Sequence, residues 1–193
     1  MRERRYKEAQ FSQEVARFFQ DKLSEAGLSV VEVKERIKIL KDLTIGLDRE
    51  NRWRLIAGFQ QQDIVFYSPL QLISLADFRS RVMRIDKYDR TGKKPITIPL
   101  LICELKIGTS INTHEMITYS SISTQLKSIF PHCAYYFVMD SNEKRGMKPE
   151  TVLRHSKGFD RVFLNWYLEK EKVWEAVQAH FAYLQDLGLM PAS

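Results

Sequence analysis

Residues 96–108 read ITIPLLICELKIG, and the predicted fold class follows from this stretch. No charged residue occurs in it before Glu104, and aliphatic side chains fill most positions. An uncharged run of this kind predicts a strand buried on both faces, as the central strands of a sheet are. Glu104 and Lys106 then place two charges at the end of that strand. Because buried charges are costly unless they are paired, these residues have either a function or a structural ion pair.

Segments on both sides of this strand show further strand and helix patterns. Short apolar runs predict strands for DIVFYS, CAYYFVMD and RVFLNWY, at residues 63–68, 133–140 and 161–167. Apolar residues recur at helical spacing in four segments, which are 11–26, 70–85, 113–129 and 173–188. Residues 28–60 fit either a strand or a helix at their start, with a strand expected near NRWRLIAGF. This order predicts an α/β fold with a mixed central β-sheet flanked by helices.

Residues with known positional preferences mark the expected ends of these elements. Ser12 is the predicted N-cap of the first helix, and Gly27 is its predicted stop. Pro69 is expected to end the DIVFYS strand. Asn112 or Thr113 is expected to cap the helix that follows the central strand.

The composition is that of a globular protein. The chain has 193 residues, of which 44% are hydrophobic and 28% charged, so one domain spanning residues 1–193 is expected. No run of about 18 apolar residues occurs, so no membrane span is expected. The charged N-terminus lacks the apolar core of a secretory signal, and we expect a cytoplasmic location. No glycine-rich phosphate loop occurs, so ATP is not an expected cofactor.

The positive charge of the chain favours a polyanionic partner. Lys and Arg number 30 against 24 Asp and Glu, which gives a formal net charge of +6. Residues 77–94 hold seven basic residues and three acids, and residues 142–161 hold six and three. These segments are either nucleic-acid contacts or solvated loops, and composition leaves both alternatives open.

Asp63, Glu104 and Lys106 together suit the hydrolysis of phosphodiester bonds. Asp63 opens the DIVFYS strand, and Lys106 follows Glu104 by two residues, so the latter two share a sheet face. An Asp and a Glu on adjacent strands can point at one ion, and Mg²⁺ prefers oxygen ligands. The lysine can then orient the attacking water, and the main-chain carbonyl of Leu105 is a further expected ligand. The alternative is a structural ion pair within this group.

A second Glu-x-Lys tripeptide, Glu32-Val33-Lys34, lacks the same context. The only Asp shortly before it is Asp21, which lies in the predicted first helix rather than on a strand. Short motifs of this kind arise by chance, so the uncharged strand before Glu104 is what distinguishes the two.

Asp63, the intervening segment and PLLICELK (99–106) resemble the PD-(D/E)XK nuclease superfamily, which includes type II restriction endonucleases and Holliday-junction resolvases. The resemblance covers roughly residues 11–140 and matches Asp63, Glu104 and Lys106 to the motif, with Gln62 where the motif has proline. It implies a restriction-endonuclease-like three-layer fold and a Mg²⁺ cofactor, with Mn²⁺ able to substitute. Asp63, Glu104 and the Leu105 carbonyl would be the metal ligands.

The resemblance also implies auxiliary residues. Many members carry an acid on the first helix near the metals, for which Glu14 is the candidate here and Glu25 a weaker one. The helix after the lysine strand lies near the active site in such nucleases, so Thr118, Tyr119 or Gln125 is expected to assist. The alternative is that these side chains have no role beyond the surface or the core.

Among such nucleases, we expect a type II restriction endonuclease that cuts double-stranded DNA at a specific sequence. The alternatives are a structure-selective repair or junction-resolving nuclease and a non-cleaving DNA-binding module. DNA contacts are expected from basic residues of the two basic segments, namely Arg79, Arg81, Arg84, Lys87, Lys144, Arg154 and Lys157.

Cutting both strands of a duplex with one site per chain is most simply done by a homodimer. The apolar stripe of the 173–188 helix is the expected contact surface, and the alternative is that it packs on its own sheet. Its residues are Val173, Trp174, Val177, Phe181 and Leu184, with Tyr183 and Leu187 beside them.

Overall fold

The computed structural model describes residues 2–47, 50–51, 53–73, 83–85, 96–107, 113–140 and 149–190. The described helices are α1 (Arg2–Glu25), α2 (Thr113–Ile129), α3 (Pro149–His155) and α4 (Trp166–Asp186). The described strands are β1 (Glu32–Leu47), β2 (Trp53–Ile73), β3 (Met83–Ile85), β4 (Ile96–Ile107), β5 (Ala134–Asp140) and β6 (Arg161–Phe163). None of the described helices has the length and apolar character needed to cross a membrane.

The predicted α/β fold with a mixed central sheet is confirmed. Within the described residues the strand order is β1-β2-β4-β5-β6, with β3 paired to β2 off this path. β2 runs antiparallel to both β1 and β4, whereas β4, β5 and β6 are parallel to one another. The two parallel connections pass through α2 and α3, as parallel strands require a crossover.

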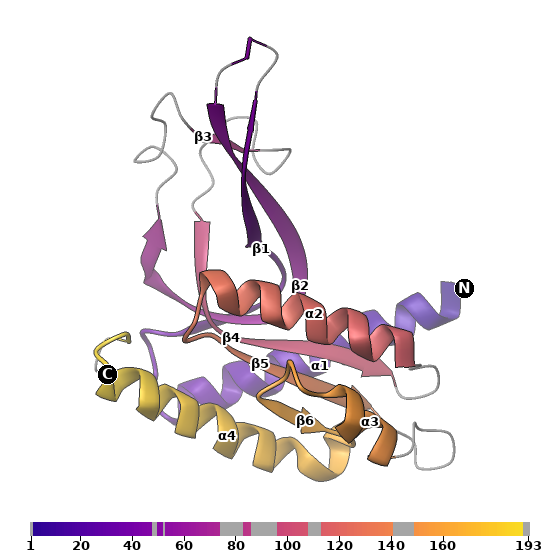
Figure 1. The fold of residues 1–193 in the computed structure, drawn as a ribbon. Coiled ribbons are helices and arrows are strands. Elements are labelled where there is room, and N and C mark those ends of the chain that lie inside the picture. Colours follow the sequence, from indigo (N-terminus) through magenta and orange to yellow (C-terminus); the bar gives the residue numbers. More distant parts are fainter. Residues whose placement is uncertain are drawn as a thin grey trace.

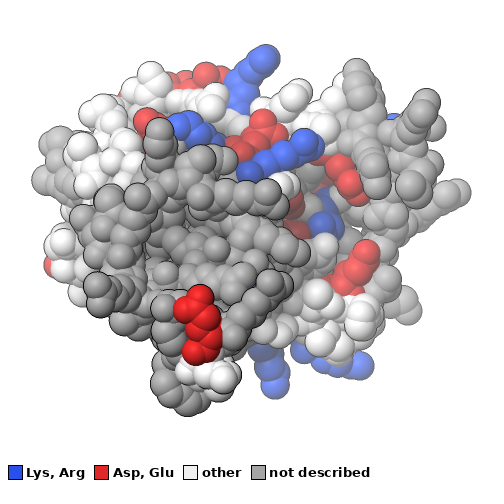
Figure 2. All heavy atoms as spheres, turned by 90° about the horizontal axis from the view of Figure 1, so that it is seen from above, with Lys and Arg blue, Asp and Glu red and all other residues white. Residues whose placement is uncertain are grey.

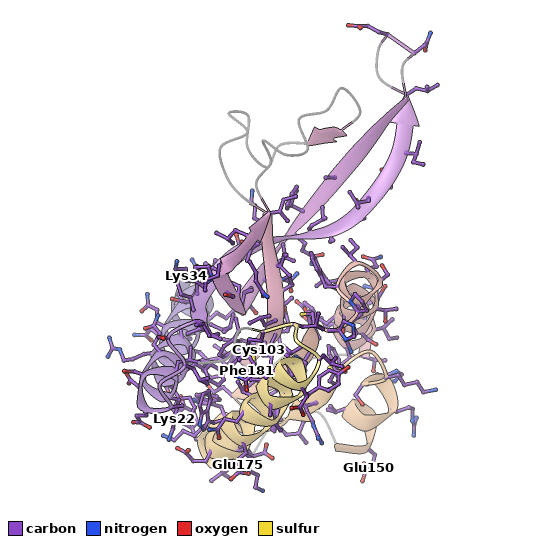
Figure 3. All side chains as sticks on the ribbon, turned by 90° about the vertical axis from the view of Figure 1, so that its left-hand side faces the viewer. Lys22, Lys34, Cys103, Glu150, Glu175 and Phe181 are labelled. Atoms are coloured by element: carbon purple, nitrogen blue, oxygen red, sulfur yellow. The ribbon has the colours of Figure 1, made fainter. Side chains whose placement is uncertain are left out.

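Helices cover both faces of the sheet, which gives three layers (Figure 1). One core lies between the sheet and α1 with α4, where Phe18 and Phe19 of α1 contact the ring of Trp166. Phe181 of α4 and Cys103 of β4, both labelled in Figure 3, belong to this core. A second core lies on the opposite face, beneath α2 and α3. β4 contributes to both cores, as its uncharged sequence predicts.

The β1–β2 hairpin extends beyond the layered body (Figures 1 and 3). Residues 28–60, whose pattern left strand and helix open, supply most of it, and the ladder runs from Glu32↔Tyr67 to Leu47↔Trp53. Leu43, Ile45 and Leu47 are exposed along its distal part.

The helix predicted for residues 70–85 is wrong where the structure describes this segment. Residues 70–73 continue β2 and residues 83–85 form β3, while residues 74–82 lie outside the described part. Leu72 pairs with Thr97 and Ile73 with Ile96, so strand partners distant in sequence outweigh the local helical spacing. Pro69 does not end the strand but lies where the register shifts, between Tyr67 and Leu72.

Two other boundaries differ from the prediction, and one agrees with it. Ser12 is not an N-cap, because α1 begins at Arg2 and Ser12 lies inside it. Gly27 does end the helix, with a φ of 68° that a residue without a Cβ adopts readily. The predicted strand at 161–167 is β6 only to Phe163, because Asn165 caps α4 through the Leu168 N–H at 3.3 Å.

The apolar stripe of α4 is core rather than a free surface. Its five predicted contact residues are buried, namely Val173, Trp174, Val177, Phe181 and Leu184. Tyr183 and Leu187 are exposed. The proposed dimer surface is therefore wrong, and a homodimer stays a prediction that would need a different surface.

Candidate active site

Asp63 lies where β2 separates from β4. The ladder between these strands reaches Ile64↔Cys103, and Asp63 and Glu104 come next on either side. Asp63 Oδ2 accepts a hydrogen bond of 2.9 Å from the Leu105 N–H. The carboxylate therefore pairs with a main-chain N–H that lies just past the last residue pair of the β2–β4 ladder. This contact holds the Asp63 side chain against β4, just beyond the end of the β2–β4 ladder.

Glu104 and Lys106 form an ion pair beside it. Lys106 Nζ lies 3.0 Å from Glu104 Oε1, with the carboxylate buried and the lysine half-buried. Lys106 Nζ also lies 4.3 Å from the centroid of the Tyr119 ring, a cation–π contact. Glu104 thus anchors the lysine from β4, and Tyr119 holds it from α2.

Two buried polar side chains, Tyr135 and Gln62, support the Glu104 carboxylate. The hydroxyl of Tyr135, on β5, lies 3.3 Å from Glu104 Oε2 and 2.9 Å from Gln62 Oε1. Its single proton serves one acceptor at a time, and Gln62 Nε2 has no partner among the described residues. With its amide turned over, Gln62 donates to Tyr135 and Tyr135 donates to Glu104, so each of the two contacts joins one donor to one acceptor. Gln62, which departs from the motif's proline, therefore has a structural use here.

The ionisation of the cluster reflects its burial. Burial raises the pKa of Glu104 to about 7, and the nearby Asp63 adds to the rise while Lys106 opposes it. Burial also raises the pKa of Asp63, against the Leu105 N–H and Lys106, which lower it. Burial lowers the pKa of Lys106, but Glu104 and Tyr119 outweigh burial and leave that pKa raised. The cluster therefore holds one charged lysine and two carboxyl groups that repel each other when both are ionised.

A pocket of about 210 Å³ opens beside these residues. It is lined from α1, β1, β2 and β4, and its lining residues are Glu8, Phe11, Ser12, Arg36, Gln61, Asp63, Leu105, Lys106 and Ile107. The Ser12 hydroxyl is buried at this pocket with no hydrogen-bond partner among the described residues. The pocket thus offers carboxylate, hydroxyl and cationic groups to a ligand.

Arg36 has a strained backbone at the edge of this pocket. Its φ is 55°, in the left-handed region that a residue with a Cβ adopts at a cost of about 1–2 kcal/mol. The β1–β2 ladder pairs Glu35 with Ile64 and Ile37 with Gln62, so Arg36 falls opposite Asp63. The β1–β2 ladder therefore lacks a pair at Asp63, and the β2–β4 ladder ends one residue away, at Ile64↔Cys103.

The donor set of the cluster fits a hard divalent cation. Asp63 and Glu104 are oxygen donors on adjacent strands, and their mutual repulsion is the kind that a bound cation relieves. No group of three or more His, Cys, Asp or Glu positioned for a metal occurs among the described residues. Two carboxylates with water suffice for Mg²⁺, whereas a zinc site would need more protein ligands.

The acid predicted on the first helix is not at the cluster. Glu14 Oε1 accepts from Trp166 Nε1 at 3.2 Å and its Oε2 from the Tyr167 hydroxyl at 3.3 Å, which ties Glu14 to the start of α4. Glu25 pairs with Lys22 at 3.6 Å. Glu8, which the sequence analysis missed, is the α1 acid that lines the pocket. Glu8 lies three residues before Phe11 and four residues before Ser12, and residues at these spacings share a helix face. This spacing is the feature of the sequence that indicates Glu8.

The two residues predicted on α2 have different positions. Tyr119 lies at the cluster, over Lys106. Gln125 is exposed on α2 and is not among the residues that line the pocket beside Asp63 and Lys106, so its auxiliary role stays a prediction.

The second Glu-x-Lys pair forms a surface ion pair. Lys34 Nζ lies 2.6 Å from Glu32 Oε2, and both side chains are substantially exposed. The Tyr67 hydroxyl donates to Glu32 at 2.6 Å, and Asp63 takes no part in this contact. The same tripeptide thus has a different environment at each of its two positions.

Most of the predicted DNA-binding residues lie outside the described part of the chain. Arg79, Arg81, Lys87 and Lys144 lie outside the described residues, and Arg84 belongs to β3. Arg154 and Lys157 are exposed near α3. Figure 2 shows basic and acidic side chains intermingled on the face viewed there, among the residues that the structure describes.

No protein family and no curated protein matches this chain. A solved structure described as "native BbvCI A2B2 tetramer at low resolution" matches with a TM-score of 0.38 and 12% sequence identity. The match covers 68% of this chain and 44% of that chain, so this chain spans less than half the length of the protein it matches. A similarity at this level carries no argument about activity.

Proposed function

We propose that this chain is a Mg²⁺-dependent endonuclease that hydrolyses phosphodiester bonds in double-stranded DNA. The observation that carries the proposal is the position of Asp63 and Glu104 on the adjacent strands β2 and β4, where the ladder between them ends, with Lys106 Nζ 3.0 Å from Glu104 Oε1. A charged cluster of this kind at a pocket supports a functional role. A structural ion pair alone, as at Glu32 and Lys34, would not need a second carboxylate.

Each residue has a definite part in this mechanism. Asp63, Glu104 and the Leu105 carbonyl would hold Mg²⁺, which when bound activates water and neutralises charge on the phosphate. Glu104 orients Lys106 through their ion pair, and Tyr119 limits its movement. Lys106 would then direct the attacking water and stabilise the negative charge that develops on the phosphate. Gln62 and Tyr135 fix the Glu104 carboxylate.

The specific form that we propose is a type II restriction endonuclease, active as a homodimer at a defined sequence. The complete set of Asp63, Glu104 and Lys106 speaks against a non-cleaving module, which has no need of all three. A junction-resolving nuclease would share the same chemistry and differ in substrate, so the substrate test decides between them.

Incubation of the purified protein with phage DNA and Mg²⁺, followed by sequencing of the fragment ends, tests this proposal. A restriction endonuclease gives ends that share one sequence, whereas a junction-resolving enzyme leaves linear duplex intact and cuts four-way junctions. Absence of cleavage on both substrates, or full cleavage in excess chelator, would contradict the proposal.

Variants of the three residues test the site itself. Asp63→Ala, Glu104→Ala and Lys106→Ala should each lower the cleavage rate at least about 100-fold, because metal or charge stabilisation is lost. Lys34→Ala is the matched control, since it removes the lysine of the other Glu-x-Lys tripeptide, and it should leave the rate unchanged. Near-normal cleavage by any of the three variants would show that residue to be misassigned.

A further inference from the structure

Arg36 lies opposite Asp63 in the β1–β2 ladder and lines the same pocket as Asp63 and Lys106. Its side chain is exposed. It takes part in none of the ion pairs found among the described residues, and its charge acts on Asp63 by lowering the pKa of that carboxyl. Lys106, by contrast, is held by Glu104 and Tyr119. Arg36 is therefore the pocket cation that remains available to a ligand.

The backbone conformation of Arg36 is not one that arginine prefers by itself. A φ of 55° is unfavourable for arginine, and glycine or asparagine would adopt it with less strain. Strained residues persist where the surrounding structure holds them, and they concentrate at functional sites. The Arg36 side chain lines the pocket together with Asp63, which it faces across the β1–β2 ladder.

We propose that Arg36 binds a phosphate of the DNA strand held at this pocket, as a substrate-positioning residue. The guanidinium presents parallel N–H donors that match two phosphate oxygens, which a lysine ammonium does not. A cation at this edge offsets the charge of Asp63, which lines the pocket and would otherwise repel a phosphate. The inference rests on the proposed nuclease function and adds the group that brings the substrate to the carboxylates.

The alternative is that Arg36 only offsets the charge of Asp63 and so stabilises the fold. Arg36→Gly separates the two possibilities, because glycine accepts the left-handed backbone and removes the guanidinium. A phosphate-binding role predicts an unchanged or higher Tm with weaker DNA binding. A purely structural role predicts a lower Tm with unchanged DNA binding.

The test measures binding of a fluorescein-labelled mixed-sequence duplex in Ca²⁺ by anisotropy, over a series of salt concentrations. Arg36→Gly should weaken binding about tenfold and reduce the slope of log affinity against log salt by about 1, the loss of one phosphate contact. Arg36→Lys should keep the salt slope while binding more weakly than the wild type. Lys172→Met, which removes an exposed charge from α4, is the control and should match the wild type.

Wild-type affinity and salt slope in Arg36→Gly would overturn the inference, as would a loss of Tm that accounts for the weaker binding. A wild type that binds duplex but cuts no DNA would contradict the proposed nuclease and leave the Arg36 contact standing. A wild type that cuts DNA, with Arg36→Gly binding normally, would overturn the Arg36 contact alone.

Discussion

At the scale of single residues, Glu104 has an ionisation that depends on the fold. Its pKa rises from 4.5 to about 7, so between these values the folded chain holds a proton that the unfolded chain releases. The proton stabilises the folded state at low pH, and this stabilisation is lost as the pH rises through about 7. Without metal, ionised Glu104 therefore destabilises the protein.

Glu104→Gln should raise the Tm of the metal-free protein at pH 8 by roughly 3–6 °C, because the amide removes the buried charge at similar volume. The difference should shrink at pH 5.5, where Glu104 is protonated. Mg²⁺ should raise the Tm of the wild type at pH 8 but not that of the variant. Thermal unfolding at both pH values checks this, and a variant less stable than the wild type at pH 8 would show that the ion pair with Lys106 dominates.

Tyr119 offers its ring face to Lys106 rather than relying on its hydroxyl alone. Tyr119→Leu should lower the cleavage rate about 3- to 30-fold, in line with the loss of a cation–π contact. Tyr119→Phe keeps the ring and should retain most of the rate. Single-turnover cleavage of DNA by both variants distinguishes them, and equal losses would assign the effect to the hydroxyl.

At the scale of the elements, the start of α4 shows how local signals decide a boundary. Asn165 accepts from the Leu168 N–H at 3.3 Å, and Glu169 accepts from the Asn165 N–H at 3.0 Å. These contacts satisfy main-chain donors at the helix start and turn the chain from β6 into α4. A strand was predicted through residue 167 because these residues are also good strand formers.

Asn165→Ala should lower the free energy of unfolding by about 1 kcal/mol through loss of this cap. Asn165→Asp is the matched control, since the carboxylate keeps the acceptor, and it should stay close to the wild type. Urea unfolding of the two variants measures the difference. If both lose the same stability, the cap is not the source of the effect.

β2 shows the opposite case, in which distant contacts decide an element. Residues 70–73 have helical spacing, yet they form a strand because β4 is available to pair with them. Where β2 leaves β4 depends likewise on both ladders, and this separation gives Asp63 its contact with Leu105. Neither feature can be read from β2 alone, since strand pairing is a property of two segments.

At the scale of the whole molecule, the fold corrects the predicted dimer surface. The α4 stripe predicted as a dimer surface lies in the core against α1 and the sheet. Cleavage of both strands still favours two sites acting together. We therefore expect a dimer in the presence of DNA, formed through a surface other than this stripe.

Light scattering at micromolar concentration, with and without duplex DNA, measures the mass and should give two protomers with DNA. Phe181→Ala should leave that mass unchanged while lowering stability by about 3–5 kcal/mol, because Phe181 fills the core. A monomer under both conditions would contradict the dimer and favour a nicking or structure-selective nuclease.

The sequence by itself determined the buried central strand, which the structure has as β4 (Ile96–Ile107), the α/β class with a mixed sheet, and the shared sheet face of Glu104 and Lys106. These follow from local patterns, because burial on both faces demands an uncharged run and alternation places Glu104 and Lys106 together. Only the tertiary structure decided that Glu8 rather than Glu14 lines the pocket, that Tyr135 and Gln62 support Glu104, and that Arg36 lies opposite Asp63. The reason is physical, since helix rotation, strand register and a left-handed backbone are set by packing between segments far apart in the chain.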